Sequence, residues 1–459
     1  MKKAFLVAGC WLLVAGLHAQ TVKEKLQKAY QQFESDTQLR HASSSLYVIN
    51  VKTGEVVFDK NSQVGLAPAS TQKIITAATA FELLGKDFRY ETKFGHVGKI
   101  KGNVLFGNFY IKSVGDPTFG SWRWVSTSDS TIGEKIKTVI RKLSIISYGG
   151  ISVDHSGWND ETIPDGWIWQ DIGNYYGAGT GGFNWRENQY DIILRSGSKV
   201  GDPVRIVRKR PEISTTILTS LATSAAKGTG DNAYVYYPLH DFRGVIRGTI
   251  PVDENAFTIS SASPNPSQEF KSFLIWEILS KMKIGQIHYE GPVNDTTILF
   301  SHYSPHLDSI IYWFLKKSIN LYGEALIKTI AYEKKGFGAT DTAVLIVKDF
   351  WKQKGLDPEE LNIKDGSGLS PQNRVTTHAQ VEVLKFAKKQ SWFSYFFDAL
   401  PEYNNMKMKS GTISDVKGFC GYHTSGDGTQ YIFSFLVNNY SGSSSSVVQK
   451  MYKVLDVLK

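Results

Sequence analysis

The stretch PASTQKIITAATAFELLG at positions 68–85 decides the fold predicted for this chain. After the proline, apolar residues recur at helical spacing, and the closing glycine is a typical helix stop. Ser70 is therefore expected at the start of a long, buried helix. Because residues three apart share a helix face, Lys73 is expected beside Ser70 one turn later. The stretch thus predicts a hydroxyl and an amine held together inside a core.

Two further short motifs follow in a fixed order. Ser318-Ile319-Asn320 lies 248 residues after Ser70, and Lys409-Ser410-Gly411-Thr412 lies near the C-terminus. Each is common alone: the Ser-x-x-Lys spacing occurs at four other places, and a second Lys-Thr-Gly stands at 52–54. That second copy lies between two β-forming runs, 46–51 and 55–58, so we interpret it as a hairpin turn.

Together the motifs supply the parts of a nucleophilic serine site. A serine hydroxyl needs a base to remove its proton, and a buried lysine near a second cation acquires a lowered pKa suited to that task. We assign the base to Lys73 and the second cation to Lys409. Ser318 could relay a proton, and the Asn320 amide could hold Lys73 and contact substrate. The alternative for Ser70, Ser318 and Asn320 is helix capping.

The C-terminal motif predicts a binding edge. Lys409, with the hydroxyls of Ser410 and Thr412, could clamp a carboxylate. Gly411 would let a ligand approach the backbone closely. The backbone N–H groups of Ser70 and Thr412 could form an oxyanion hole. The alternative is a polar turn between two strands, but the order of all three motifs favours the site.

Composition places the chain among exported globular proteins. With 459 residues, 41% hydrophobic and 21% charged, it is expected to form two or three domains. Residues 1–20 combine two lysines, an apolar run and a small residue, which predicts a signal peptide cleaved near Ala19/Gln20. A lipid anchor at Cys10 is the less favoured alternative, because the apolar run continues past it. Cleavage leaves only Cys420, so no internal disulfide is expected.

The formal charge of +9 predicts a mildly basic surface. Attraction to an anionic envelope polymer, or peripheral association with a membrane surface, stays open as an alternative. No basic run is dense enough to predict nucleic-acid binding. The glycine pattern at 177–182 follows no hydrophobic strand, and Pro305 separates His302 from His306, so neither a dinucleotide nor a metal is predicted. We expect no cofactor.

The patterning along the chain divides it into a split domain and an insertion. Residues 94–305 carry short β-like runs, aromatic clusters and many glycines and prolines. Helical periodicity returns at 321–332 and 342–354, and the C-terminus is expected to form strand, turn, strand and helix. This predicts an α/β domain interrupted by a largely β insertion.

These motifs resemble the penicillin-recognising serine acyltransferases, and the details are similar to the D-alanyl-D-alanine carboxypeptidase/endopeptidase family of class C low-molecular-mass penicillin-binding proteins. The wide gap between the first two motifs carries the resemblance. So do Gly115-Asp116-Pro117-Thr118, the stretch 167–177 and Asp365-Gly366-Ser367-Gly368-Leu369-Ser370, followed by 373–375.

The resemblance implies a fold and its boundaries. We expect a split penicillin-binding-protein/β-lactamase-like transpeptidase domain, an antiparallel sheet flanked by helices, at 21–93 and 305–459. Two mostly β inserted domains are expected, domain II at 94–118 and 205–304 and domain III at 119–204.

The resemblance also implies an activity. Ser70 would be acylated by the D-Ala-D-Ala end of a peptidoglycan stem peptide, with Lys73, Ser318, Asn320 and Lys409 completing the site, and β-lactams would be trapped there. Asp171 and Tyr176 match positions that contact the amino end of the stem peptide's diamino acid. The alternatives are a β-lactamase and a catalytically silent peptidoglycan-binding protein.

Two departures from the family leave substrate preference open. Pro371 stands where relatives often have a basic residue, and the segment 400–405 before Lys409 is short. The balance of carboxypeptidase and endopeptidase activity, and the oligomeric state, do not follow from the sequence.

Overall fold

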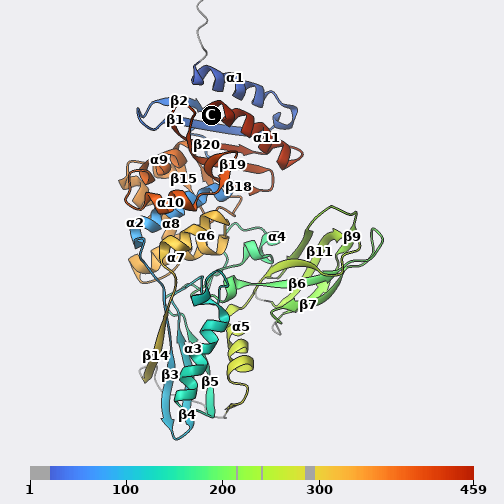
Figure 1. The fold of residues 1–459 in the computed structure, drawn as a ribbon, viewed down its shortest axis with the longest axis vertical. Coiled ribbons are helices and arrows are strands. Elements are labelled where there is room, and N and C mark those ends of the chain that lie inside the picture. Colours follow the sequence, from blue (N-terminus) through green and yellow to red (C-terminus); the bar gives the residue numbers. More distant parts are fainter. Residues whose placement is uncertain (1–20, 213–215, 239–240, 285–294) are drawn as a thin grey trace, which may run out of the picture.

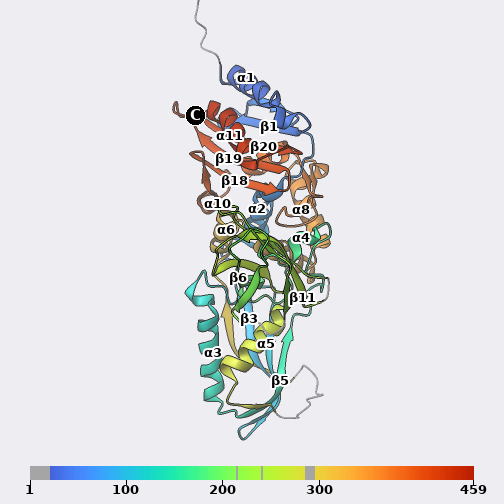
Figure 2. The ribbon, with the colours of Figure 1, turned by 90° about the vertical axis from the view of Figure 1, so that its right-hand side faces the viewer.

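The computed structural model describes residues 21–459 except 213–215, 239–240 and 285–294. The predicted signal peptide, residues 1–20, lies outside the described residues. The molecule is elongated, with one body that contains the N-terminal and C-terminal segments and two lobes formed by the middle of the chain (Figure 1). The side view in Figure 2 shows the same body above the lobes. Among the described residues, no helix has the length and apolarity needed to span a bilayer.

The body is built on an antiparallel sheet with the strand order β17-β18-β19-β20-β1-β2. Pairing between β1 and β20 joins the two ends of the split domain, with Tyr47 opposite Ser434. The predicted hairpin around 52–54 is present as β1 and β2. The strands are β1 (Ser43–Asn50), β2 (Val56–Lys60), β17 (Glu402–Tyr403), β18 (Met406–Ile413), β19 (Val416–Thr424) and β20 (Gln430–Asn438).

Helices cover both faces of this sheet. On one face, α1 (Val22–Glu34) and α11 (Ser444–Leu455) pack through residues such as Tyr30 and Met451 onto Phe433 and Phe435. A second core on the other face includes Ile74, Ile310 and Leu326. Its helices are α2 (Lys73–Leu84), α6 (Leu307–Lys316), α7 (Asn320–Lys335), α8 (Thr340–Gln353), α9 (Thr377–Ala387) and α10 (Phe393–Ala399).

The first lobe is a five-stranded sheet of order β13-β5-β4-β3-β14, and α3 and α5 pack on it. The chain leaves the body along β3 and returns along β14, which pair with Glu91 opposite Tyr303. The elements are β3 (Glu91–Lys101), β4 (Val104–Lys112), α3 (Asp129–Lys142), β5 (Ser147–Asp154), α5 (Pro266–Phe273), β13 (Lys283–Ile284) and β14 (Thr296–Tyr303).

The second lobe joins two small sheets around one core. One has the order β12-β6-β7, and the other is centred on β11, which pairs with β8, β9 and β10. The strands are β6 (Gln189–Arg195), β7 (Arg205–Arg210), β8 (Ile217–Ser220), β9 (Thr223–Ala225), β10 (Asn232–Tyr236), β11 (Arg243–Pro251) and β12 (Phe257–Ala262).

The sheets divide the insertion differently from the predicted inner boundaries. β5 lies in the segment 119–204 assigned to domain III, but it pairs in parallel with β4 of domain II. β7 to β12 lie in the segment 205–304 assigned to domain II, but they form the second lobe with β6. The reason is that α3 forms a crossover between the parallel strands β4 and β5. The first lobe is thus mixed α and β.

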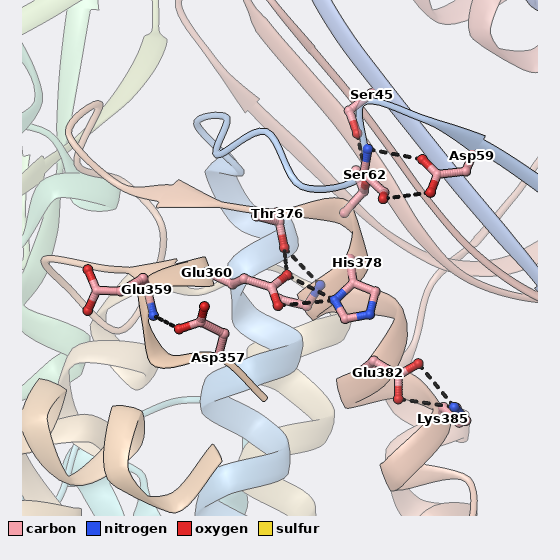
Figure 3. Close-up of polar contacts among 12 residues, drawn as sticks. Ser45, Asp59, Ser62, Asp357, Glu359, Glu360, Thr376, His378, Glu382 and Lys385 are labelled. Atoms are coloured by element: carbon pink, nitrogen blue, oxygen red, sulfur yellow. Dashed lines mark hydrogen bonds and ion pairs between the residues drawn. The ribbon is translucent and has the colours of Figure 1, made fainter. Parts of the chain in front are cut away.

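A buried polar junction fixes the start of α9. Figure 3 shows the carboxylate of Glu360 facing Thr376 and His378. Thr376 caps the helix by accepting from the Ala379 N–H at 2.9 Å, and its hydroxyl donates to Glu360. His378 Nδ1 lies 2.9 Å from Glu360 Oε2. The junction attaches α9 to the short ladder of β15 (Leu361–Asn362) and β16 (Arg374–Val375).

Candidate active site

Ser70 lies in a tight turn at the head of α2. Residues Ala69–Gln72 form a 3₁₀ turn, and the α-helix begins at Lys73. Side chains three apart are eclipsed in a 3₁₀ turn, so this geometry brings the two groups together. Lys73 Nζ lies 2.9 Å from Ser70 Oγ. Ala69 has a φ of 46°, a left-handed conformation that turns the chain sharply before Ser70.

The Lys73 amine has a set of partners suited to a neutral base. Besides Ser70, it donates to Asn320 Oδ1 at 2.6 Å and to the Ser367 carbonyl at 2.7 Å. Both oxygens only accept, so they take two of the N–H bonds of Lys73, and its third position faces Ser70 Oγ, where a neutral amine would carry its lone pair. Lys73 is fully buried. Burial, followed by the charge of Lys409, lowers the Lys73 pKa well below its ordinary value.

Asn320 joins three parts of the chain. It is the first residue of α7, and its Nδ2 donates to the Tyr176 carbonyl of the insertion at 2.7 Å. Ser318 precedes the helix with a φ of 57° and lines the same cavity as Ser70. Within the described chain, no hydrogen bond links the Ser318 hydroxyl to Ser70 or Lys73. The structure therefore brings Ser318 to the site without fixing its partner.

The third motif lies on β18, against the turn that holds Ser70. Gly411 allows this contact, because a Cβ there would lie 2.5 Å from the Pro68 carbonyl oxygen and 3.0 Å from the Ser70 nitrogen. Lys409 is buried and donates to the Ser410 carbonyl at 2.9 Å. Burial lowers the Lys409 pKa to about 7. Thr412 reaches the cavity, and its hydroxyl accepts from Lys417 at 2.7 Å.

A cavity of about 700 Å³ opens in front of Ser70. Its wall combines residues of the body, such as Leu369, Pro371 and Thr412, with Asp171 and Tyr176 of the insertion. Asp171 lies on α4 (Trp169–Ile172), and its side chain lines the cavity together with Tyr176. Burial raises the Asp171 pKa to about 6. The cavity therefore has the nucleophile at one side and a carboxyl group on its wall.

Several residues that shape the site received no role in the sequence-based prediction. The Ser367 carbonyl contacts Lys73, and the Asp365 carboxylate accepts from the Gly368 and Ser370 N–H groups and from Trp167 Nε1. Glu187 is buried and accepts from Arg123 and from the Tyr322 hydroxyl at 2.7 Å each. The run at 365–368 contributed only to the family resemblance, and nothing local in it indicated its contacts with Lys73 and Trp167, which lie far away in the sequence.

A serine in contact with a buried lysine of lowered pKa, next to the edge of an antiparallel sheet, is the arrangement of a serine acyltransferase. Comparison with known proteins identifies the family of serine acyltransferases to which the chain belongs. The family model for D-Ala-D-Ala carboxypeptidase 3 (S13) matches residues 24–458. The chain belongs to this family. The predicted family is thus confirmed, and so is the enzyme class, a serine D-Ala-D-Ala carboxypeptidase.

Similar proteins align with most of the length of the chain. A D-alanyl-D-alanine carboxypeptidase of Actinomadura sp. (strain R39) is 25% identical over 446 residues, which cover 90% of this chain and 81% of the relative. Penicillin binding protein 4 (dacB) of Haemophilus influenzae has a crystal structure 20% identical to this chain, with a TM-score of 0.78 and coverage of 94% and 98%. Its complex with a β-lactam is also 20% identical, with a TM-score of 0.73 and coverage of 95% and 99%. The fold class is confirmed.

Proposed function

We propose that this D-Ala-D-Ala peptidase acts through an acyl-enzyme on Ser70, with Lys73 as the base. The observation that carries the proposal is the 2.9 Å contact between Ser70 Oγ and Lys73 Nζ, with the remaining Lys73 partners limited to acceptors. The neutral amine takes the Ser70 proton while Oγ attacks the carbonyl carbon of the D-Ala-D-Ala bond. General-base assistance of this kind contributes about 10²- to 10⁴-fold.

The remaining groups complete the cycle. The oxyanion would be held by the N–H groups of Ser70 and Thr412, and the Lys409 ammonium, with the hydroxyls of Ser410 and Thr412, would attract the terminal carboxylate. The carbon–nitrogen bond breaks, and the proton from Lys73 reaches the leaving amine through Ser318, which releases D-alanine. Water then attacks the ester, the Ser70 oxygen regains its proton, and the shortened peptide leaves.

The substrate is a peptidoglycan stem peptide with a free or cross-linked amine. Asp171 and Tyr176 line the cavity, and a carboxylate there suits the ammonium of the diamino acid. Whether the enzyme trims free stems or cleaves cross-links is decided by mass spectrometry of digested peptidoglycan. Loss of free pentapeptide stems indicates a carboxypeptidase, and loss of cross-linked dimers indicates an endopeptidase.

β-Lactams should acylate the same serine, as the Haemophilus relative's β-lactam complex suggests. A fluorescent penicillin is expected to label the wild-type protein covalently and to leave Ser70→Ala unlabelled. Labelling of folded Ser70→Ala would contradict the assignment. Rapid turnover of the drug would indicate a β-lactamase, and absence of both labelling and D-alanine release would indicate a silent binding protein.

Export is part of this proposal, because the substrate lies in the cell envelope. Residues 1–20 would be removed near Ala19/Gln20. The mass of the mature protein recovered from its host tests this directly: a chain that keeps residues 1–20 would contradict it.

A further inference from the structure

Glu324 is a buried carboxyl group that the reaction described above does not use. It lies on α7, one turn after Asn320, and its side chain has no contact with solvent. Its Oε2 accepts a hydrogen bond of 3.0 Å from the Gly366 N–H. Its other oxygen, Oε1, has no hydrogen-bond partner in the part of the chain that the structure describes. Burial of an ionised carboxylate with one oxygen unpartnered is strongly unfavourable, which favours the neutral acid.

The loop that Glu324 holds at the Gly366 N–H continues, one residue later, to a carbonyl that contacts the Lys73 amine. Gly366 donates to Glu324, and its carbonyl accepts from the Thr76 hydroxyl on α2 at 2.6 Å. The carbonyl of the next residue, Ser367, accepts from Lys73 at 2.7 Å. A displacement of Gly366 would therefore move one of the two acceptors that orient the amine.

Two glycines permit this contact between α7 and the loop. A Cβ at Gly366 would lie 2.3 Å from the Gly323 carbonyl oxygen, and a Cβ at Gly323 would lie 3.0 Å from the Gly366 carbonyl oxygen. The first distance is too short for a side chain, and the second would require the loop to shift by a few tenths of an ångström. The carboxyl of Glu324 can reach the Gly366 N–H because the two backbones touch.

The charges around Glu324 act in both directions: Asp365 opposes a second negative charge there, whereas Lys73 and Lys328 favour one. Asp365 directly precedes Gly366, and its carboxylate has several donors: the N–H groups of Gly368 and Ser370, Trp167 Nε1, Asn373 Nδ2 and Gln72 Nε2. The cations that face Glu324 are Lys73 on α2 and Lys328 on α7. Lys328 donates to the carbonyls of Glu161 and Thr180. Burial, then the charge of Asp365, raises the Glu324 pKa to about 8.

We propose that Glu324 is a positioning residue that works as a neutral carboxylic acid. It holds the loop at the Gly366 N–H, one residue before the Ser367 carbonyl that accepts from Lys73, and, because it carries no charge, it does not stabilise the ammonium form of Lys73. An ionised Glu324 would favour the protonated, inactive lysine. The inference rests on the proposed role of Lys73 as the base.

Three variants separate this role from simple packing. Glu324→Gln keeps the acceptor for Gly366 without a charge, so its acylation rate with a fluorescent penicillin at neutral pH should stay within about threefold of wild type. Glu324→Leu leaves the Gly366 N–H unpaired, so its rate should fall about 10- to 100-fold. The matched control is Glu269→Gln, a buried carboxyl in the insertion, which should leave the rate unchanged.

Infrared spectroscopy reports the protonation state directly. At neutral pH, the wild-type spectrum minus the Glu324→Gln spectrum should contain the carbonyl stretch of a protonated carboxylic acid, and this signal should fade above about pH 8. The proposal is overturned if that signal is absent, or if Glu324→Gln is as slow as Glu324→Leu. If Glu324→Leu does not fold, the infrared comparison of wild type with Glu324→Gln still tests the proposal. Failure of the base assignment itself is distinguishable, because Lys73→Met would then be acylated as fast as wild type.

Discussion

Lys73 Nζ donates a 2.6 Å hydrogen bond to Asn320 Oδ1, although 247 positions separate the two residues. The same amide donates through Nδ2 to the Tyr176 carbonyl at 2.7 Å. One side chain therefore connects α2, α7 and the inserted segment. The insertion is a direct part of the site, because its backbone sets the orientation of the amide that faces the lysine.

Asn320→Asp should raise the Lys73 pKa. A carboxylate would replace the neutral acceptor and stabilise the ammonium, and it would also face the Tyr176 carbonyl without a proton to donate. We expect acylation by a fluorescent penicillin at neutral pH to fall by about 10²-fold or more. Because a raised pKa keeps the lysine protonated to higher pH, part of the rate should return as pH rises.

The control is Asn265→Asp, the same substitution at the N-cap of α5, where aspartate also caps well. It should be acylated like wild type. A rate for Asn320→Asp with the pH dependence of wild type would show that the amide does not control the lysine.

Gly411→Ala should separate β18 from the turn that holds Ser70. The added Cβ would lie 2.5 Å from the Pro68 carbonyl oxygen and 3.0 Å from the Ser70 nitrogen, so the strand must move. We expect acylation to fall about 10²- to 10³-fold, as for loss of an oxyanion donor. The free energy of unfolding, measured with denaturant, should fall by about 1–3 kcal/mol.

A matched control for this variant is Gly65→Ala, where the added Cβ would meet only Arg374 Cβ at 3.4 Å. This variant should keep both acylation and stability. If Gly411→Ala were acylated at the wild-type rate, the close approach of β18 to Ser70 would have no role in the reaction.

The sequence predicts the elements of the site better than their partners. The helix α2 follows from the local pattern after Pro68, and β18 follows from the strand-rich C-terminus. The 3₁₀ turn that holds Ser70 was not predicted, because Ser70 was expected in the first turn of the helix itself. The hydrogen bond from Lys73 to the Ser367 carbonyl and the one from Asn320 to the Tyr176 carbonyl depend on contacts between segments far apart in the chain. Such contacts leave no local periodicity.

The strand pairing in the insertion departs from the predicted inner boundaries for a related reason. β4 and β5 pair in parallel across α3, and this pairing leaves no turn signal between adjacent strands. The predicted division at 118/119 separated these two strands. A prediction from local runs of β-forming residues finds the strands but not their neighbours in the sheet.

Asp171 should make recognition of an amino-bearing substrate dependent on pH. Its pKa is raised to about 6 by burial, so it loses its charge as pH falls through that value. We expect kcat/KM for a stem pentapeptide with a free side-chain ammonium to fall below about pH 6, relative to acylation by a penicillin without an ammonium. The ratio removes effects of Lys73 and Lys409, which both reactions share.

Asp171→Asn should abolish this relative pH dependence and weaken the peptide reaction at neutral pH. If the ratio changed with pH in the same way in Asp171→Asn as in wild type, the ammonium would be recognised elsewhere.

His378 should stabilise the fold more at acidic than at alkaline pH. Its hydrogen bond to Glu360 raises its pKa above the ordinary value of 6.5 (Figure 3). A group with a raised pKa in the folded state contributes its full stability below the unfolded pKa, and loses it as pH rises through the folded pKa. Because the His378 side chain is partly exposed, the contribution should be about 1 kcal/mol or less.

Denaturant unfolding of wild type and His378→Gln at about pH 5.5 and about pH 8.5 measures this contribution, since the two conditions lie on either side of the ordinary histidine pKa. The wild-type advantage should be present at the lower pH and shrink at the higher pH. His41→Gln, at an exposed position, controls for general effects of replacing a histidine. An advantage that is equal at both values, or larger at the higher pH, would show that the ring acts through its packing on Tyr47 and not through its charge.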